Sequence, residues 1–178
     1  MIKEMTTENL KDINKTNQPF KIIGKIVPVF SEGAWSYSEI LFEKEYEKTY
    51  PNDEEESEDY EEYIGNPDKT VFFYYDGADC VGQVILRKNW NKYALIEDIS
   101  VAKSHRTDGI GSKLMLKAIQ WAKSNGLFGL VLETQDTNLL ACRFYEKHGF
   151  QIGAVDTMLY ANFDNADEKA VFWYKKFT

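Results

Sequence analysis

The sequence predicts an α+β fold in which a mixed, mostly antiparallel sheet is flanked by helices. From residue 70 onward, short apolar runs with strand character alternate with two stretches of helical periodicity, in the order β-β-β-α-β-α-β-β. Hydrophobic residues make up 43% and aromatic residues 15% of the 178 positions, which is enough to bury a core. We therefore expect a single domain over residues 1–178 with its core at about residues 70–160.

The strands follow from apolar runs that are bounded by turn residues. Residues 20–30 have strand character, a turn follows at 31–33, and residues 35–46 fit either a strand or a helix. Three further strands are predicted at 71–75, 81–87 and 93–101, with turns at 76–79 and 88–92. The last strands are predicted at 127–133, 150–160 and 169–177.

The two helices follow from periodicity and from the glycines that end them. Residues 109–125 carry one apolar stripe, formed by Ile110, Leu114, Ala118, Trp121 and Ala122. Gly126 suits the left-handed position that ends such a helix. Residues 138–148 form a shorter helix, which Gly149 closes.

The charge of the chain bears on its partners. The formal net charge is -8, and eight of the ten residues at 53–62 are acidic. An acidic chain is a poor match for the phosphates of nucleic acid and a better match for a small cationic partner. The acidic stretch is interpreted first as a solvated helix or loop, and alternatively as a lip that collects a cationic substrate.

The composition also predicts where the protein is located and whether it has a metal site. The N-terminus is polar, and no segment is apolar enough to span a membrane, so we expect a cytoplasmic protein without a membrane partner. Cys80 and Cys142 share no ligand spacing with His105 or His148, which favours free thiols and no metal site. A homodimer is one possibility for the assembly.

The most informative segment joins a predicted strand to a predicted helix at residues 101–114, VAKSHRTDGIGSKL. A helix N-terminus offers unpaired backbone N–H groups and a favourable dipole for anions. Gly109 and Gly111 allow that backbone to approach a phosphate, and Arg106 adds a positive group. The segment lacks the spacing of a Walker loop and of a Rossmann fingerprint. It is therefore interpreted as a pyrophosphate cradle, against the alternative of a glycine-rich connection without a ligand.

A second segment, NLLACRFYEKHGF at residues 138–150, follows in the expected order. Together the two segments resemble the GCN5-related N-acetyltransferase superfamily, whose Arg-x-x-Gly-x-Gly/Ala loop holds the pyrophosphate of coenzyme A. The resemblance implies acetyl-CoA as co-substrate and a strand that pairs with its pantetheine arm. Thr107 departs from the family, in which many members have glycine there. The cofactor-binding residues so implied are Ile99, Ser100, Val101, Arg106, Thr107, Asp108, Gly109, Ile110, Gly111, Ser112, Asn138 and Tyr145.

A second resemblance, to a smaller family, covers nearly the whole chain. The segments RKNW (87–90), ALIEDIS (94–100), LETQDTNLLACRFY (132–145) and VDTMLYANF (155–163) resemble streptothricin acetyltransferases. The resemblance implies acetyl transfer to an amine on the β-lysine moiety of streptothricin, a cationic antibiotic, and hence resistance to it.

Acetyl transfer to an amine needs an acid and a base. In this superfamily a tyrosine at the position of Tyr145 often serves as general acid toward the leaving thiolate, and a core tyrosine is the alternative. Glu97 and Asp98 are adjacent in a strand, so their side chains are expected on opposite faces. Polyamine acetyltransferases carry a similar pair, which implies Glu97 as base and Asp98 as the amine-binding residue. Glu133 is the rival base, because protein N-terminal acetyltransferases carry theirs at its position.

Two other functions remain open from the sequence. One is an acetyltransferase that acts on polyamines or on a protein amine. The other is a non-catalytic sensor that binds acyl-CoA, against which the presence of Glu97, Glu133 and Tyr145 argues.

Overall fold

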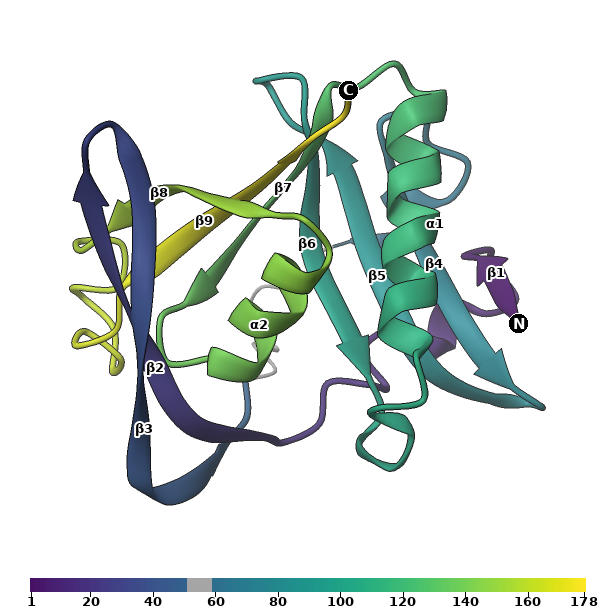
Figure 1. Ribbon diagram of the computed structural model, residues 1–178. Coiled ribbons are helices and arrows are strands. Elements are labelled where there is room, and N and C mark those ends of the chain that lie inside the picture. Colours follow the sequence, from purple (N-terminus) through teal and green to yellow (C-terminus); the bar gives the residue numbers. More distant parts are fainter. Residues whose placement is uncertain (51–58) are drawn as a thin grey trace. The chain divides into compact units, whose positions relative to one another are not determined.

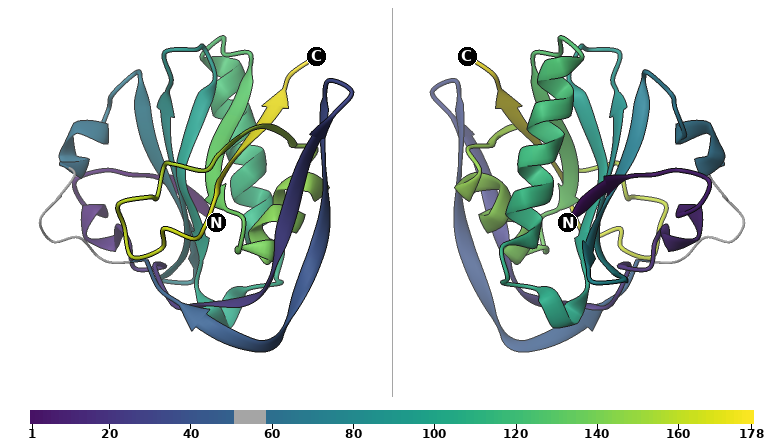
Figure 2. Two further views of the ribbon diagram at one scale, coloured as in Figure 1. Left: turned by 90° about the vertical axis from the view of Figure 1, so that its left-hand side faces the viewer. Right: turned by 90° about the vertical axis from the view of Figure 1, so that its right-hand side faces the viewer.

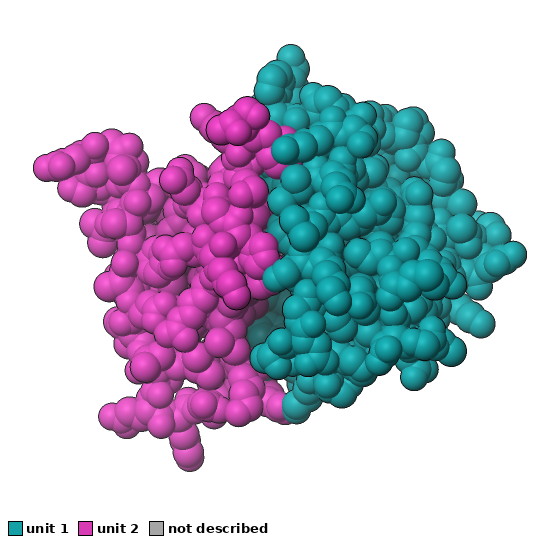
Figure 3. Space-filling view, turned by 45° about the vertical axis from the view of Figure 1, so that its right-hand side comes forward, with its two compact units in different colours: residues 1–20, 49–130 teal, residues 21–48, 131–178 magenta. Residues whose placement is uncertain are grey.

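The computed structural model describes residues 1–50 and 59–178. It divides into two compact units, shown in two colours in Figure 3. Unit 1 contains residues 1–20 and 49–130, and unit 2 contains residues 21–48 and 131–178. Residues 53–58 of the acidic stretch lie outside the described residues. Its last residues, 60–62, belong to a short 3-10 helix, η2 (Tyr60–Tyr63).

Unit 1 is built on four antiparallel strands in the order β1-β4-β5-β6 (Figure 1). They are β1 (Ile2–Glu4), β4 (Lys69–Asp76), β5 (Asp79–Lys88) and β6 (Ala94–Val101). The last three confirm the predicted strands. Strand β1 was not predicted, because three residues are too short to show a period. It is fixed at its start by the N-terminal amine, which donates to the Tyr75 carbonyl at 2.6 Å.

One face of this sheet is covered by helix α1 (Ile110–Ser124), which packs on β4, β5 and β6 (Figure 1). The predicted stripe is confirmed, with Ile110, Leu114, Ala118 and Ala122 all buried. The helix comes close because β5 has a glycine beneath it. A Cβ atom on Gly82 would lie 3.0 Å from side-chain carbons of both Ile110 and Leu114.

The opposite face is covered by η2 and a second 3-10 helix, η1 (Leu10–Asp12). Alternate residues of the strands point to this face and bury apolar side chains against the two short helices. This core cluster consists of Met5, Tyr63, Val71, Phe73, Tyr75 and Ile85.

Unit 2 begins with a long hairpin of β2 (Phe20–Ser31) and β3 (Ala34–Lys48), which pair as a separate two-stranded sheet (Figure 2). The structure therefore resolves residues 35–46 as strand. Burial alternates along this part of β3: Trp35 and Tyr37 are partly buried, whereas Ser36 and Ser38 are exposed. This alternation is the two-residue period of a strand.

The rest of unit 2 contains helix α2 (Leu139–Lys147) and three strands in the order β7-β9-β8. These are β7 (Gly129–Gln135), whose first two residues belong to unit 1, β8 (Gln151–Asp156) and β9 (Ala170–Lys176). The prediction that a strand continues to residue 160 was wrong. The Asp156 carboxylate accepts from the N–H groups of Met158 and Leu159 and turns the chain at the end of β8.

No helix in the described ranges 1–50 and 59–178 is both long and apolar enough to cross a membrane. Cys80 and Cys142 are free thiols.

Candidate active site

The glycine-containing loop of unit 1 connects β6 to α1 through a 3-10 turn, η3 (Lys103–His105). Two residues of the loop adopt the left-handed region, Thr107 with φ 80° and Gly109 with φ 76°. Gly109 is the N-cap of α1, and the first hydrogen bond of the helix runs from the Lys113 N–H to the Gly109 carbonyl. The N-terminus of α1 therefore begins at Gly109, and the backbone N–H groups and dipole of a helix N-terminus can receive an anion.

Arg106 has a role that its sequence position did not reveal. Its Nε donates to the Val101 carbonyl at 3.0 Å, Nη1 to Pro19 at 2.8 Å and Nη2 to Gln18 at 3.2 Å. The Gln18 side chain in turn accepts from the Lys103 N–H at 2.7 Å. The guanidinium thus clamps the N-terminal segment to both ends of the loop, while its charge still contributes to the positive potential around the helix terminus.

The expectation that Glu97 and Asp98 point to opposite faces was wrong. Asp98 pairs with Ile85 and Ile96 pairs with Leu86, so Glu97 is an extra residue in β6, a β-bulge. Glu97 forms an ion pair with Arg87 at 2.5 Å and accepts from the Tyr63 hydroxyl at 2.7 Å. The bulge interrupts the alternation, and both carboxylates reach the sheet face opposite α1.

Asp98 belongs to a buried polar network. Its carboxylate accepts from Gln83 at 2.6 Å and from Ser100 at 2.9 Å. Gln83 also holds the turn at Asn14, and the Ser100 hydroxyl lies 2.8 Å from that of Thr16. Burial raises the pKa of Asp98, and the hydrogen bonds from Gln83 and Ser100 oppose this rise. Asp98 therefore joins the N-terminal segment to β5 and β6.

In unit 2, Asn138 and Tyr145 lie on the second predicted segment. Asn138 is the N-cap of α2, and its side chain accepts from the Ala141 N–H at 3.3 Å. The Tyr145 ring is 8% exposed, with its centroid 5.9 Å from that of Phe150 and 6.3 Å from that of Trp173. The ring is therefore packed between aromatic side chains.

Glu133 has the environment expected of a base. It lies in β7 and accepts a short hydrogen bond from the Tyr160 hydroxyl. Burial, and next the negative charge of Glu168, raise the pKa of Glu133 to about 7. A carboxyl group with this pKa can accept a proton near neutral pH and release it again. Tyr160 was interpreted from the sequence only as part of an aromatic cluster, and nothing local in the sequence pairs it with Glu133.

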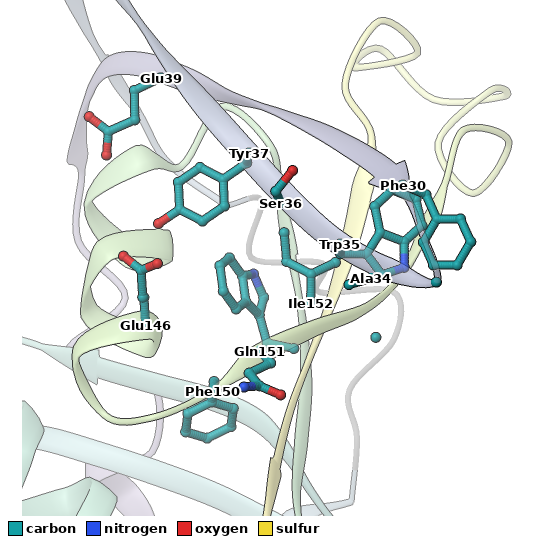
Figure 4. Close-up of a pocket in the computed structure, with 13 residues that line it drawn as sticks. Phe30, Ala34, Trp35, Ser36, Tyr37, Glu39, Glu146, Phe150, Gln151 and Ile152 are labelled. Carbon is teal, nitrogen blue, oxygen red and sulfur yellow. The ribbon is translucent and has the colours of Figure 1, made fainter.

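Unit 2 also has a cavity of about 890 Å³, and its lining includes Phe150 and Trp173, which pack against Tyr145 (Figure 4). The hairpin residues Phe30, Trp35 and Tyr37 form one wall, and Tyr37 points toward Glu146 of α2. Burial, and next a hydrogen bond to Glu146, raise the pKa of Tyr37.

These elements match a known family. The model of the acetyltransferase (GNAT) family matches residues 37–150, which include the loop, α1, β7 and α2. The chain belongs to the GNAT acetyltransferase family.

Relatives and solved structures match over nearly the whole chain. It is 51% identical over 177 residues to streptothricin acetyltransferase A of Bacillus subtilis (strain 168), covering 99% of this chain and 100% of that protein. A Bacillus anthracis protein solved in complex with acetyl coenzyme A superposes with a TM-score of 0.89 at 35% identity, covering 100% and 97% of the two chains. A nourseothricin acetyltransferase superposes with a TM-score of 0.81 at 25% identity, covering 99% and 97%. The GNAT fold predicted from the sequence is confirmed.

The residues of unit 1 fit the phosphate end of acetyl-CoA. Residues 106–109 of the predicted loop form the connection and residues 110–112 the first turn of α1, while Ile99 to Val101 lie in the strand that leads into the loop. Among residues 1–50 and 59–178, no group of three or more His, Cys, Asp or Glu side chains could hold a metal ion. Of the residues predicted to take part in catalysis or substrate binding, Glu133 and Tyr145 lie in unit 2, and Glu97 and Asp98 lie in unit 1.

Proposed function

We propose that this protein is a streptothricin N-acetyltransferase that uses acetyl-CoA and confers resistance to the antibiotic. The observation that carries the proposal is the 51% identity, without a missing segment, to streptothricin acetyltransferase A. The match to a nourseothricin acetyltransferase over 99% of the chain supports it. The amine that receives the acetyl group is proposed to be one on the β-lysine moiety.

Glu133 is the proposed general base. The substrate ammonium must lose a proton before its nitrogen can attack, and a carboxylate with a pKa of about 7 suits that transfer at neutral pH. The Tyr160 hydroxyl donates to the carboxylate and fixes its orientation. Glu97, the other candidate, is held by Arg87 and Tyr63, which suits a structural ion pair better than a proton acceptor.

Tyr145 is the proposed general acid. Bound acetyl-CoA supplies the acetyl thioester, and its departing thiolate needs a proton. A phenol and a thiol have ordinary pKa values of about 10 and 8.5, so the Tyr145 hydroxyl can hydrogen-bond to the thiolate and protonate it. Solvent then returns a proton to the phenolate.

The test is a panel of amines with acetyl-CoA, following released thiol. Streptothricin, spermidine, a peptide with a free N-terminus and a neutral amine are compared by kcat/KM. Streptothricin is expected to be the best substrate by far. A preference for spermidine or the peptide would reassign the acceptor, and binding of acetyl-CoA without turnover of any amine would indicate a sensor.

A further inference from the structure

The segment at residues 157–169, between β8 and β9, carries Tyr160 and is fixed at both ends. Asp156 accepts from two N–H groups at its start, at 2.7 and 3.0 Å. At its end, the Lys169 N–H donates to the Asp136 carboxylate at 3.0 Å, and the Lys169 carbonyl accepts from the Asp136 N–H at 2.9 Å. Its path over the end of β7 is therefore defined by hydrogen bonds.

Glu168 is the centre of these contacts. Its two oxygens accept from Lys48 of β3 at 2.8 and 2.6 Å, from the Thr137 hydroxyl at 2.6 Å and from the Asn165 amide at 2.8 Å. The Glu168 side chain is only 11% exposed and that of Lys48 22%. Burying an ion pair to this extent costs hydration, and the several hydrogen bonds to Glu168 compensate for that loss.

We infer that Glu168 is a positioning residue that holds the 157–169 segment on β7, so that the Tyr160 hydroxyl rests on the Glu133 carboxylate. Gln135 supports the same contact, because its amide donates to the Tyr160 oxygen at 3.2 Å. Thr137 and Gln135 frame the end of β7, and Glu168 ties the segment to Thr137 beside them. The inference rests on the proposed function only where Glu133 is called the base.

The charges around Glu133 make the inference testable. Glu168 raises the pKa of Glu133, and Lys48 partly neutralises Glu168. The other charged groups of unit 2 near this site are Asp136, whose pKa burial raises, and the cations Lys25 and Lys169 that oppose this rise. Removing Glu168 should thus affect the Glu133 titration in two opposing ways, because it removes a negative charge and also releases the Tyr160 hydroxyl from the carboxylate.

The experiment measures the titration of the Glu133 carboxyl carbon by NMR in protein labelled with ¹³C-glutamate, without substrate. The signal is assigned by its loss in Glu133→Gln. In a Tyr160→Phe background, Glu168→Gln acts through its charge alone and should lower the midpoint by about half to one pH unit. In the wild-type background the fall should be smaller, because release of the Tyr160 hydroxyl from the carboxylate raises the midpoint. Asp167→Asn, which removes one exposed charge at the neighbouring position, is the matched control and should leave the midpoint unchanged.

Amide hydrogen exchange tests whether Glu168 holds the 157–169 segment in place. Amides of residues 157–169 should exchange faster in Glu168→Gln than in the wild type or in Asp167→Asn. Equal midpoint shifts in the two backgrounds, or unchanged exchange of residues 157–169, would overturn the inference. If Glu168→Gln does not fold, Thr137→Val decides, because it removes the hydrogen bond between Glu168 and the end of β7 without changing a charge, and exchange of residues 157–169 should again become faster. Unequal shifts and faster exchange in a protein that does not acetylate streptothricin would support the inference and refute the proposed function.

Discussion

Thr107 adopts a backbone conformation that suits glycine. Its φ of 80° lies in the left-handed region, where a β-branched side chain is strained, and its side chain is exposed. Glycine would adopt this backbone conformation without strain, in agreement with the family pattern from which Thr107 departs.

We expect Thr107→Gly to raise the free energy of unfolding by about 1 kcal/mol. Relief of strain outweighs the greater entropy of glycine in the unfolded chain, since no packing is lost. Thermal melting is the measurement, and acetyl-CoA affinity should not fall. Thr7→Gly, at an exposed threonine without positive φ, is the control and should not stabilise.

Tyr145→Phe should lower kcat by about 10²–10⁴-fold and leave acetyl-CoA affinity nearly unchanged. The substitution removes the hydroxyl but keeps the ring that packs against Phe150 and Trp173. Steady-state kinetics and calorimetry with acetyl-CoA are the measurements. Tyr37→Phe, which removes a hydroxyl beside Glu146 in the same unit, should keep normal turnover. Normal turnover in Tyr145→Phe would assign Tyr145 to the core.

The pKa of Glu133, about 7, predicts how activity depends on pH. A base acts in its ionised form, so kcat/KM should rise as the pH increases through about 7 and then level off. Glu133→Gln should abolish this rise and lower kcat/KM by about 10²–10⁴-fold. Glu97→Gln, measured in parallel, should keep the pH dependence even though it disrupts the Arg87 ion pair. The reverse result would make Glu97 the base.

At the scale of elements, the approach of α1 to β5 sets where the helix N-terminus lies. Gly82→Val would push branched carbons against Ile110 and Leu114, two residues in the first turns of α1. We expect a loss of about 1–3 kcal/mol in the free energy of unfolding and weaker acetyl-CoA binding, because the N–H groups of the loop shift with the helix.

A double-mutant cycle tests this contact. Adding Leu114→Ala should restore part of the lost stability, so that the double variant is less destabilised than the sum of the two single changes. Strict additivity would show that Gly82 and Leu114 do not compete for space.

Elements were predictable where a local period or a turn residue defines them. The stripe of α1, the helix ends at Gly126 and Gly149 and the strands β4, β5 and β6 all follow from neighbours in sequence. The bulge at Glu97 was not predictable, because it depends on the register with β5. The end of β8 was missed for a different reason, because the local turn that the Asp156 carboxylate makes with Met158 and Leu159 interrupts an apolar pattern that continues beyond it.

The residues of the candidate site divide in the same way, into those that local motifs locate and those that only distant contacts bring together. The anion-binding turn and Tyr145 could be located from local motifs. The Arg106 clamp and the Tyr160–Glu133 pair could not, because their partners lie 87 or 88 and 27 residues away along the chain. Such contacts are fixed only by the fold.

At the scale of the whole molecule, the net charge of -8 should favour the capture of a polycationic substrate. Part of that charge is concentrated at residues 53–62, of which 53–58 lie outside the described residues. Their charge is known from the sequence alone.

We therefore expect kcat/KM for streptothricin to fall as salt rises, while that for a neutral amine changes little. Long-range attraction is screened when the Debye length falls from about 10 Å at 0.1 M to about 3 Å at 1 M salt. A residual preference for streptothricin should remain at high salt, because contacts within the site are screened less. The sequence predicts such a contact at Asp98, whose carboxylate also accepts hydrogen bonds from Gln83 and Ser100.

The acidic stretch can be separated from the overall charge by two triple variants. Glu54→Gln, Glu55→Gln and Glu56→Gln remove three charges from the stretch, and Glu32→Gln, Glu43→Gln and Asp164→Asn remove three from exposed positions of unit 2. Both have a net charge of -5, since -8 loses three negative charges. If the stretch collects the substrate, the first variant loses more of kcat/KM at low salt and most of its salt dependence. Equal losses would mean that only net charge matters, and no loss in either would exclude electrostatic capture as the reason for the preference.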